Sequence, residues 1–282
     1  MARRADIVMI TYRSAGYLHL SLPRLLDSLS DDDRVWLWHN GDDEATLEAL
    51  RPYTSDSRVE RFHHSRENVR LREPTNWLWR ESDAQFVSKV DDDCLVSPEW
   101  LDTFAAAHRD IPHLGVVGSW RHWPEEFRPD LAERKIQEFP GGHRLMRNPW
   151  VQGSAHLLRR QLAVDAGYLR EGESFTEFCR RLALSGAING FYFPFVQEEH
   201  MDDPRSPNTL IRTDADLADR LPLSAQRNGI RTVEEWTAQL ERSAVVLQSA
   251  PYELKYYRGW RPKLKHVHQR IRKALGMRVV PW

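Results

Sequence analysis

Runs of hydrophobic residues alternate with amphipathic stretches along most of the chain. Continuous apolar runs predict buried strands, and apolar residues that recur every third or fourth position predict helices. The predicted strands are 6–12, 35–39, 59–62, 86–90, 114–118 and 191–196, and the predicted helices are 18–29, 44–50, 73–80, 98–108 and 177–182. Strands that alternate with helices in this order favour an α/β fold with a mostly parallel sheet and covering helices.

Three consecutive carboxylates, Asp91, Asp92 and Asp93, follow the strand predicted over 86–90. Open α/β sheets bind their ligands at the carboxyl ends of parallel strands, where these carboxylates fall. Their charges repel one another and oxygen ligands suit Mg²⁺ or Mn²⁺, so we expect a divalent cation among them. If the chain stays extended, Asp91 and Asp93 point to one side and Asp92 to the other. The alternative is a solvated acidic turn, which is how we interpret a second triplet, 31–33, that lies before a strand.

The alternating pattern covers residues 1–204, where one large α/β domain is expected, and residues 205–282 are expected to form a C-terminal extension. Helical spacing over 214–220 and 232–247 predicts that this extension is helical, and Thr232 is a predicted N-cap residue. A chain of 282 residues is long enough to bury a substantial core in the larger domain.

Charge is distributed unevenly along the chain. Nine positive and no negative residues follow Glu253, whereas residues 1–253 carry a net charge of −10, although the whole chain is close to neutral at −1. Basic residues mixed with aromatic ones over 254–282 are typical of a segment that binds an anionic membrane surface. The same segment could instead bind an anionic acceptor or cover the acidic body. Nucleic acid is not an expected partner, because the acidic body would repel a polyanion.

Targeting and redox features are few. The sequence has no apolar run of the ~18 residues that a transmembrane helix needs, and it enters the first predicted strand without the apolar region of a signal peptide. The two cysteines, Cys94 and Cys179, supply no disulfide framework and fit a reducing compartment. We therefore expect a cytoplasmic protein, with peripheral binding at the inner face of a membrane as the role of 254–282.

The order of these features resembles a GT-A type nucleotide-sugar glycosyltransferase of family 2. The similar stretches are the opening strand and turn (7–13), the second strand and its turn (38–43), the Asn-containing segment (68–76), the acidic motif (90–93), the Gly-Ser-Ala to Arg-Arg stretch (152–160) and the Ala-Gly-Tyr triplet (166–168). The resemblance extends over 7–200 and implies a Rossmann-like GT-A fold for the larger domain. It also implies transfer of a sugar from a nucleotide diphosphate sugar to an acceptor hydroxyl.

The resemblance implies specific roles for residues at the predicted strand ends. A Mn²⁺ or Mg²⁺ ion held by Asp91, Asp93 and His200 would bridge the donor diphosphate. The expected donor-binding residues lie in the loops that follow the strands: Thr11, Tyr12, Arg13, Asn40, Asp42, Asp43, Asn68, Arg70, Asp91, Asp92, Gln152 and Gly153. Flat aromatic rings could stack on an acceptor sugar, and the candidates are Trp120, Trp123 and Trp150. The acceptor is expected to be a glycan, a lipid-linked sugar or a small molecule.

The catalytic base is where the sequence departs from this family. The resemblance predicts an aspartate two residues before Glu177, but Phe175 stands there. Ser174 and Glu177 have the spacing of a capping box, which gives Glu177 a structural role. Glu173 lies just before the cap and is the expected general base of an inverting displacement, with Glu171 and Glu177 as alternatives. A retaining mechanism without such a base is a further alternative.

Two other function classes stay open. A glycan- or nucleotide-binding module that lost catalysis would keep the fold and lack the base. A phosphohydrolase with an aspartate nucleophile also carries Asp-x-Asp after a strand, but that motif belongs on the first strand, whereas Asp91 follows the fourth. The sequence therefore favours a metal-dependent glycosyltransferase.

Overall fold

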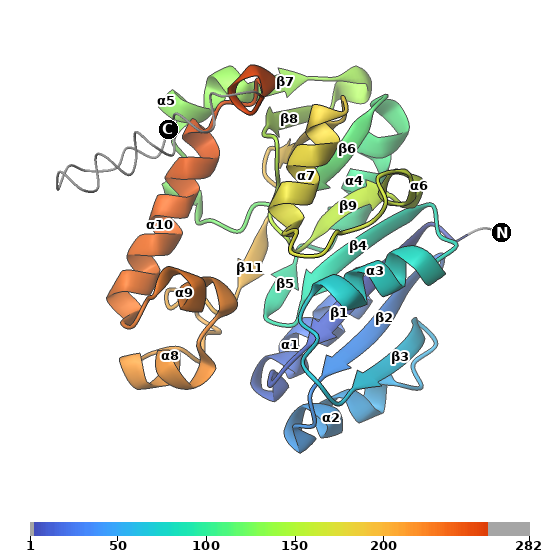
Figure 1. Ribbon diagram of the computed structural model, residues 1–282, viewed down its shortest axis with the longest axis vertical. Helices are drawn as coiled ribbons and strands as arrows, with labels where there is room; N and C mark the ends of the chain where they lie inside the picture. Colours follow the sequence, from blue (N-terminus) through green and yellow to red (C-terminus); the bar gives the residue numbers. More distant parts are fainter. Residues whose placement is uncertain (1–2, 259–282) are drawn as a thin grey trace.

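A nine-stranded mixed sheet with helices on both faces forms the centre of the molecule (Figure 1). The structure is a computed structural model, and it describes residues 3–258. The strands lie in the order β3-β2-β1-β4-β9-β6-β10-β8-β7. Their bounds are Ala5–Thr11 (β1), Asp33–Asn40 (β2), Val59–Ser65 (β3), Phe86–Asp91 (β4), Leu114–Gly118 (β6), Ile136–Glu138 (β7), Arg144–Arg147 (β8), His156–Arg159 (β9) and Ile188–Phe193 (β10). A separate two-stranded ribbon consists of β5 (Cys94–Val96) and β11 (Glu198–His200).

Helices cover both faces of the sheet. Their bounds are Ala15–Asp27 (α1), Glu44–Leu50 (α2), Arg72–Glu81 (α3), Trp100–Asp110 (α4), Pro129–Ala132 (α5), Arg160–Asp165 (α6), Phe175–Leu184 (α7), Asp214–Arg220 (α8), Leu223–Asn228 (α9) and Val233–Ser249 (α10). Short 3-10 turns occupy Arg51–Tyr53, Pro124–Glu126, Glu133–Lys135, Pro140–Gly142 and Leu254–Tyr256. One face packs against α1, α2 and α4, and the other against α3, α6 and α7.

The predicted fold class is confirmed. Strands β3, β2, β1 and β4 are parallel, and β10 is parallel to β6. Strand β9 lies between β4 and β6 and is antiparallel to both, and β8 is antiparallel to β10 and β7. The sheet is therefore mostly parallel, and the carboxyl ends of β1, β2 and β4 meet at the edge where the acidic motif lies.

Alternation along the central strands explains why helices are needed on both faces. Ile7 and Met9 of β1 belong to the core on the α1 and α4 side, whereas Val8 and Ile10 belong to the core on the α3 and α7 side. All four residues are buried. A strand that is buried on both faces requires a continuous apolar run, which is the pattern that predicted it.

Two parts of the chain contain strands that the sequence did not predict. The helix predicted from residue 98 begins at Trp100, because residues 94–96 continue from the acidic turn as β5 and pair with β11. The segment 120–149, for which no strand was predicted, contains β7 and β8, which extend the sheet beyond β10. Strands β5 and β8 pair with segments that are distant in the sequence, whereas β7 pairs with the nearby β8. Strands this short show no local periodicity.

The C-terminal helices, at the left of Figure 1, pack against the rest of the chain. In the described part of the extension, residues 205–258, α8 and α10 lie where helices were predicted, and α9 is an additional helix. Gln248 of α10 donates from Nε2 to the Glu126 carbonyl at 2.9 Å and accepts the Arg128 N–H at 2.6 Å. Trp236 of α10 donates from Nε1 to the Asp202 carbonyl at 2.9 Å. In the described part of the chain, no helix is long and apolar enough to cross a membrane.

Candidate functional site

The acidic motif lies in a tight turn between β4 and β5. Asp91 is the last residue of β4, and Asp92 and Asp93 form the turn itself. The chain is not extended past Asp91, so the predicted alternation of the three side chains does not apply. Asp91 forms an ion pair with Lys89, which lies two residues earlier on the same face of the strand. Gly153 lies beside this pair, since a Cβ at Gly153 would be 4.0 Å from Lys89 Cε.

Asp93, Cys94 and His200 bring their side chains together at this turn. Cys94 and His200 are directly opposite each other in the β5–β11 ribbon, and Sγ lies 3.2 Å from Nε2. The Oδ1 atom of Asp93 lies 3.5 Å from Cys94 Sγ. One ligand atom from each of these residues lies within 4.8 Å of the other two. Of the three predicted metal ligands, Asp93 and His200 meet here, and Cys94 rather than Asp91 completes the group.

Two further carboxylates, Glu198 and Asp202, surround His200. Oε1 of Glu198 lies 3.3 Å from Nε2, and Oδ1 of Asp202 lies 3.8 Å from Nδ1. Burial raises the pKa of Asp93, and the charge of Asp202 raises it further. Burial by itself would lower the pKa of His200, but the neighbouring Glu198 raises it above its ordinary value. Negative charge is concentrated around His200, and this set of oxygen and nitrogen donors fits a divalent cation that would relieve the repulsion.

The loop between β1 and α1 packs against the second carboxylate of the motif. The Tyr12 N–H donates to Asp92 Oδ2 at 3.0 Å, and burial raises the pKa of Asp92. The Tyr12 and Arg13 side chains are exposed beside the motif, and Arg13 has a positive φ of 53°. Thr11 is fully buried, with its hydroxyl 2.9 Å from His39 Nδ1. Its side chain therefore cannot reach a donor, contrary to the prediction.

Asp43 and Asn40 have structural roles in the turn after β2. Asp43 caps α2, because its Oδ1 accepts the Thr46 N–H at 3.0 Å, and its Oδ2 accepts the Arg13 N–H at 3.2 Å. Asn40 is buried and donates from Nδ2 to the Arg70 carbonyl at 3.1 Å. These side chains were predicted to bind the donor, but the structure uses them to position the loops that carry Arg13 and Arg70.

Asp42, Asn68 and Arg70 remain accessible at this edge. Asp42 lies 3.1 Å from His64 Nε2, and its side chain is 60% exposed. Asn68 accepts the Arg70 N–H at 2.9 Å and so holds Arg70 in the left-handed region at a φ of 63°. Like Tyr12 and Arg13, these predicted donor-binding residues have side chains that a ligand can reach without rearrangement.

The segments after β6 and before β9 also contribute residues to the site. Arg121 Nε and Gln152 Oε1 are buried and have no hydrogen-bond partner among the described residues. Gln152 Nε2 lies 3.4 Å from His122 Nε2. The charge of Arg121 acts on the pKa values of both His200 and Asp202, so Arg121 lies beside the cluster. Buried polar atoms without partners indicate a ligand or water, and Arg121 was missed because one arginine after a strand carries no sequence signal.

Glu173, at the start of α7, forms a bidentate ion pair with Arg181. Its carboxylate accepts hydrogen bonds from Arg181 Nε at 2.8 Å and Nη2 at 2.7 Å, and from the Arg170 N–H at 3.0 Å. Burial would raise the pKa of Glu173, but these hydrogen bonds outweigh it and lower the pKa. Both oxygens are occupied, which argues against the predicted role as general base. Glu177 forms the predicted capping box with Ser174, and the hydrogen bonds of that box lower its pKa.

The three tryptophans that were predicted to stack on an acceptor have different surroundings. Trp120 is fully buried and stacks on Phe195 with ring centroids 4.5 Å apart, so its ring cannot contact an acceptor. Trp123 is partly exposed and donates from Nε1 to Asp203 Oδ2 at 3.1 Å. Trp150 is partly exposed with a guanidinium 5.7 Å from its ring centroid. Trp123 and Trp150 therefore stay available as acceptor contacts.

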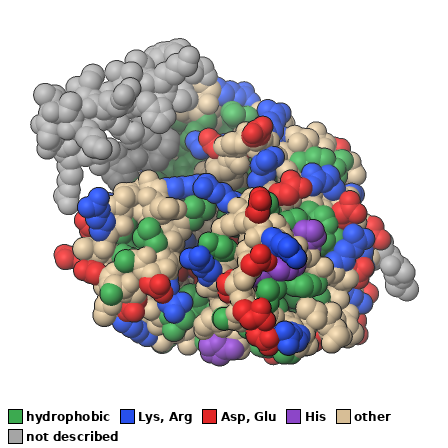
Figure 2. All heavy atoms as spheres, turned by 60° about the horizontal axis from the view of Figure 1, so that its bottom comes forward, with side chains coloured by type: hydrophobic (Ala, Val, Ile, Leu, Met, Phe, Trp, Pro, Cys, Tyr) green, Lys and Arg blue, Asp and Glu red, His purple; other side chains and the backbone are tan. Residues whose placement is uncertain are grey.

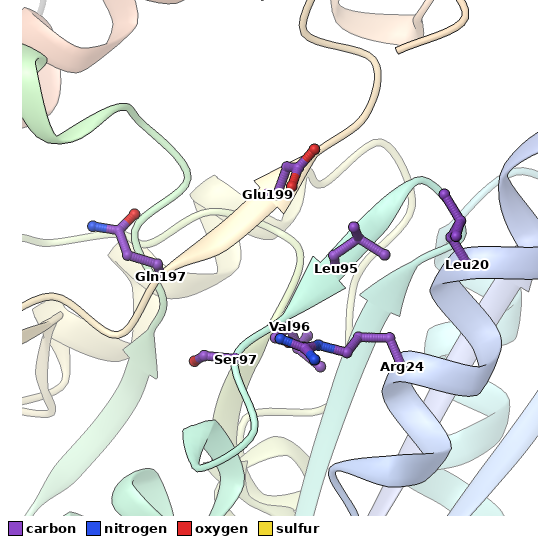
Figure 3. A pocket seen from close by; sticks show the side chains of 7 residues that line it. All are labelled: Leu20, Arg24, Leu95, Val96, Ser97, Gln197 and Glu199. Atoms are coloured by element: carbon purple, nitrogen blue, oxygen red, sulfur yellow. The ribbon is translucent and has the colours of Figure 1, made fainter. Parts of the chain in front are cut away.

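A pocket of about 460 Å³ lies between α1 and the β5–β11 ribbon (Figure 3). Arg24 of α1 lines it, together with Leu95 and Glu199 of the ribbon. Leu95 and Glu199 are paired, so they point away from the ribbon face that carries Cys94 and His200. This pocket is therefore separate from the candidate metal ligands.

The face of the molecule that Figure 2 presents mixes charges of both signs. Figure 2 shows blue, red and hydrophobic side chains interleaved over the face that it presents. Such a face lacks the single-sign field that draws a charged partner from a distance. On this face, recognition of a charged molecule would depend on local groups.

The fold is similar to that of solved glycosyltransferase structures. A mannosyltransferase from Pyrobaculum calidifontis, solved with GDP-Man and Mn²⁺, is 15% identical, with a TM-score of 0.58 over 96% of this chain and 81% of that chain. Residues 1–349 of S. aureus TarS are 16% identical, with a TM-score of 0.53 over 71% of this chain and 61% of that chain. The same piece of TarS with UDP-GlcNAc is 16% identical, with a TM-score of 0.51 over 67% of this chain and 55% of that chain. At these identities the likeness shows the fold.

The sequence itself identifies the family. Residues 6–165 match the family described as "Glycosyl transferase family 2", and this match covers more than half of the chain. No curated protein matches the sequence. The mixed α/β sheet and the acidic motif at its edge agree with the family match. This protein therefore belongs to glycosyl transferase family 2.

Proposed function

We propose that this glycosyltransferase is metal-dependent and moves a sugar from a nucleotide diphosphate sugar to an acceptor hydroxyl. The convergence of Asp93 and His200 at the carboxyl edge of the sheet carries the proposal, because their ligand atoms lie within 4.8 Å. Structures of similar fold that were solved with UDP-GlcNAc, and with GDP-Man and Mn²⁺, support it. The donor nucleoside and sugar are left open.

Asp91, Asp93 and His200 would hold Mn²⁺ or Mg²⁺ at this edge, and Asp91 would exchange its partner Lys89 for the cation. Such an ion neutralises the negative charge that a departing diphosphate carries. Arg70 of the neighbouring loop is exposed, and a guanidinium suits phosphate oxygens. The chain's own residues would thus supply a cation site and a positive side chain at one edge of the sheet.

Calorimetric titration of UDP and GDP, with and without Mn²⁺, tests the metal assignment. In the wild type Mn²⁺ should tighten nucleotide binding, and Asp93→Asn should lose roughly 10- to 100-fold of that enhancement, the range seen when groups around bound metals are changed. Asp31→Asn is the matched control, since Asp31 lies in the other aspartate triplet, in the turn before β2. If Mn²⁺ tightened nucleotide binding equally in the wild type and in Asp93→Asn, the assignment of Asp93 as a metal ligand would be wrong.

An inverting displacement is the stereochemistry that we propose, on the family resemblance. Because Glu173 is bound to Arg181, the proton of the acceptor hydroxyl would pass to another base or to water. The anomeric configuration of the product, read by NMR once an acceptor is identified, tests this proposal. A product with retained configuration would contradict it.

We propose that residues 254–282 bind the protein peripherally to the cytoplasmic face of a membrane. The nine positive charges after Glu253 support it, and a lipid-linked acceptor would then lie within reach. Residues 259–282 lie outside the described part of the chain. At the start of the segment, Arg258 donates to the Leu184 carbonyl at 2.8 Å. A glycan or a small molecule is the alternative acceptor.

A further inference from the structure

We propose that Cys94 is a metal ligand and that Asp93, Cys94 and His200 form a site for a thiophilic divalent cation of the Zn²⁺ class. This site rests on the proposed metal-dependent function, because it shares Asp93 and His200 with the donor-metal site. The sequence predicted only oxygen and nitrogen ligands there, and the thiol of Cys94 is the new element.

Cys94 Sγ lies at distances from the other two ligand atoms that are close to those of a tetrahedral zinc site. Zinc binds thiolate sulfur at ~2.3 Å and imidazole nitrogen at ~2.0–2.1 Å, which at a tetrahedral angle places the two atoms ~3.6 Å apart. Cys94 Sγ and His200 Nε2 are 3.2 Å apart, and Cys94 Sγ and Asp93 Oδ1 are 3.5 Å apart. Cys94 and His200 are paired on adjacent strands, so side-chain adjustment without backbone movement would admit a cation between them.

Glu198 places a further buried carboxylate beside this position. Its side chain is fully buried, and neither carboxylate oxygen has a hydrogen-bond partner among the described residues. It lies two residues before His200 on the same face of β11, with Oε1 3.3 Å from His200 Nε2. Burying a carboxylate without hydrogen bonds is costly unless positive charge balances it. Glu198 is therefore a buried carboxylate beside the cluster, and a cation bound there would help to balance its charge.

A sulfur ligand changes which cation the site prefers. Zn²⁺ takes four sulfur, nitrogen or carboxylate ligands, whereas Mg²⁺ demands six, almost all of them oxygen. Cys94 is 1% exposed, so the protein excludes bulk water from the sulfur side of the site. Because Asp93 and His200 would serve both cations, Zn²⁺ should compete with Mn²⁺ for binding.

Cobalt substitution tests the thiolate ligand directly. Co²⁺ occupies zinc-type sites, and a cobalt–thiolate bond adds a near-ultraviolet charge-transfer band that oxygen and nitrogen ligands do not produce. The full-length protein, freed of metal by chelation and titrated with Co²⁺ in the absence of nucleotide, should develop this band, and added Zn²⁺ should remove it. Cys94→Ala should lose the band. Cys179→Ala should keep it, because Cys179 is the other buried cysteine and lies on α7.

Circular dichroism of each variant separates loss of the ligand from loss of the fold, and Cys94→Ser is a second variant of similar size. A wild type that binds Co²⁺ without the near-ultraviolet band, or a folded Cys94→Ala that keeps the band, would overturn the thiolate ligand. Either result would leave the donor-metal proposal standing if Mn²⁺ still tightens UDP or GDP binding. Absence of both the band and the Mn²⁺ effect would overturn the two proposals together.

Discussion

Glu173 shows how one ion pair changes the expected role of a residue. Because its carboxylate is bound by Arg181, we expect Glu173→Gln to lower the free energy of unfolding by about 1–3 kcal/mol. Turnover with an identified acceptor should fall by less than the ~10²–10⁴-fold that a general base contributes. Urea unfolding and steady-state kinetics measure the two effects, with Glu177→Gln as the control at the neighbouring cap. A large loss of turnover at unchanged stability would restore Glu173 as the base.

Lys89 is the buried partner of the acidic motif. Its side chain is 5% exposed and pairs with Asp91, which is 28% exposed. Lys89→Met should lower the free energy of unfolding by about 1–3 kcal/mol, less than the full cost of breaking a buried pair, because Asp91 still reaches water. Added Mn²⁺ should raise the melting temperature more in this variant than in the wild type. The double variant with Asp91→Asn should recover part of the stability, and an additive loss would contradict the pairing.

Helix α10 is attached to the sheet domain through a buried lysine. Lys135 Nζ donates to the Leu247 carbonyl of α10 at 2.5 Å and to Asn148 Oδ1 at 3.1 Å. Burial lowers the pKa of Lys135 from 10.5 to about 7, so between these values the unfolded chain binds the proton more tightly than the folded protein. The free energy of unfolding should therefore rise as pH increases from about 7 to about 10, and below about 7 the cost of burying the charge is constant.

Urea unfolding at several pH values, for the wild type and Lys135→Met, measures this dependence. The variant should lose the part of the slope that belongs to Lys135, so the difference in stability between the two proteins should change with pH. A constant difference across this range would mean that Lys135 keeps its ordinary pKa in the folded protein.

At the scale of the whole molecule, we expect the acidic body to bind nucleotide and the basic segment 254–282 to bind an anionic membrane surface. Deleting 259–282 removes seven of the nine positive charges that follow Glu253. Each basic residue near an anionic surface contributes about 1 kcal/mol, so the intact protein should sediment with phosphatidylglycerol vesicles at low salt and be released at high salt. The deletion variant should bind vesicles far more weakly and keep its affinity for nucleotide. Failure of the intact chain to sediment at low salt would rule out the membrane role.

Local patterns in the sequence determined most of the fold. Helices α2 and α8 lie where their apolar spacing predicted them, and β6 has its predicted bounds. The physical reason is that a helix buries one face with a period of 3.6 residues, and a strand covered on both faces requires an uninterrupted apolar run. The place of Asp91 at the end of β4 was predicted in the same way, from the run of residues directly before it.

Tertiary structure decided which side chains meet at the site. His200 reaches Cys94 across 106 residues of sequence only because β11 pairs with β5, and strands of three residues carry no periodic signal. Glu173 lies at the position where a base was expected, but Arg181 binds its carboxylate. Trp120 is buried against Phe195 instead of facing an acceptor. These contacts depend on hydrogen bonds and packing between distant segments, whose energies no local pattern contains. The sequence by itself therefore determined where the carboxylates lie, and the fold determined their partners.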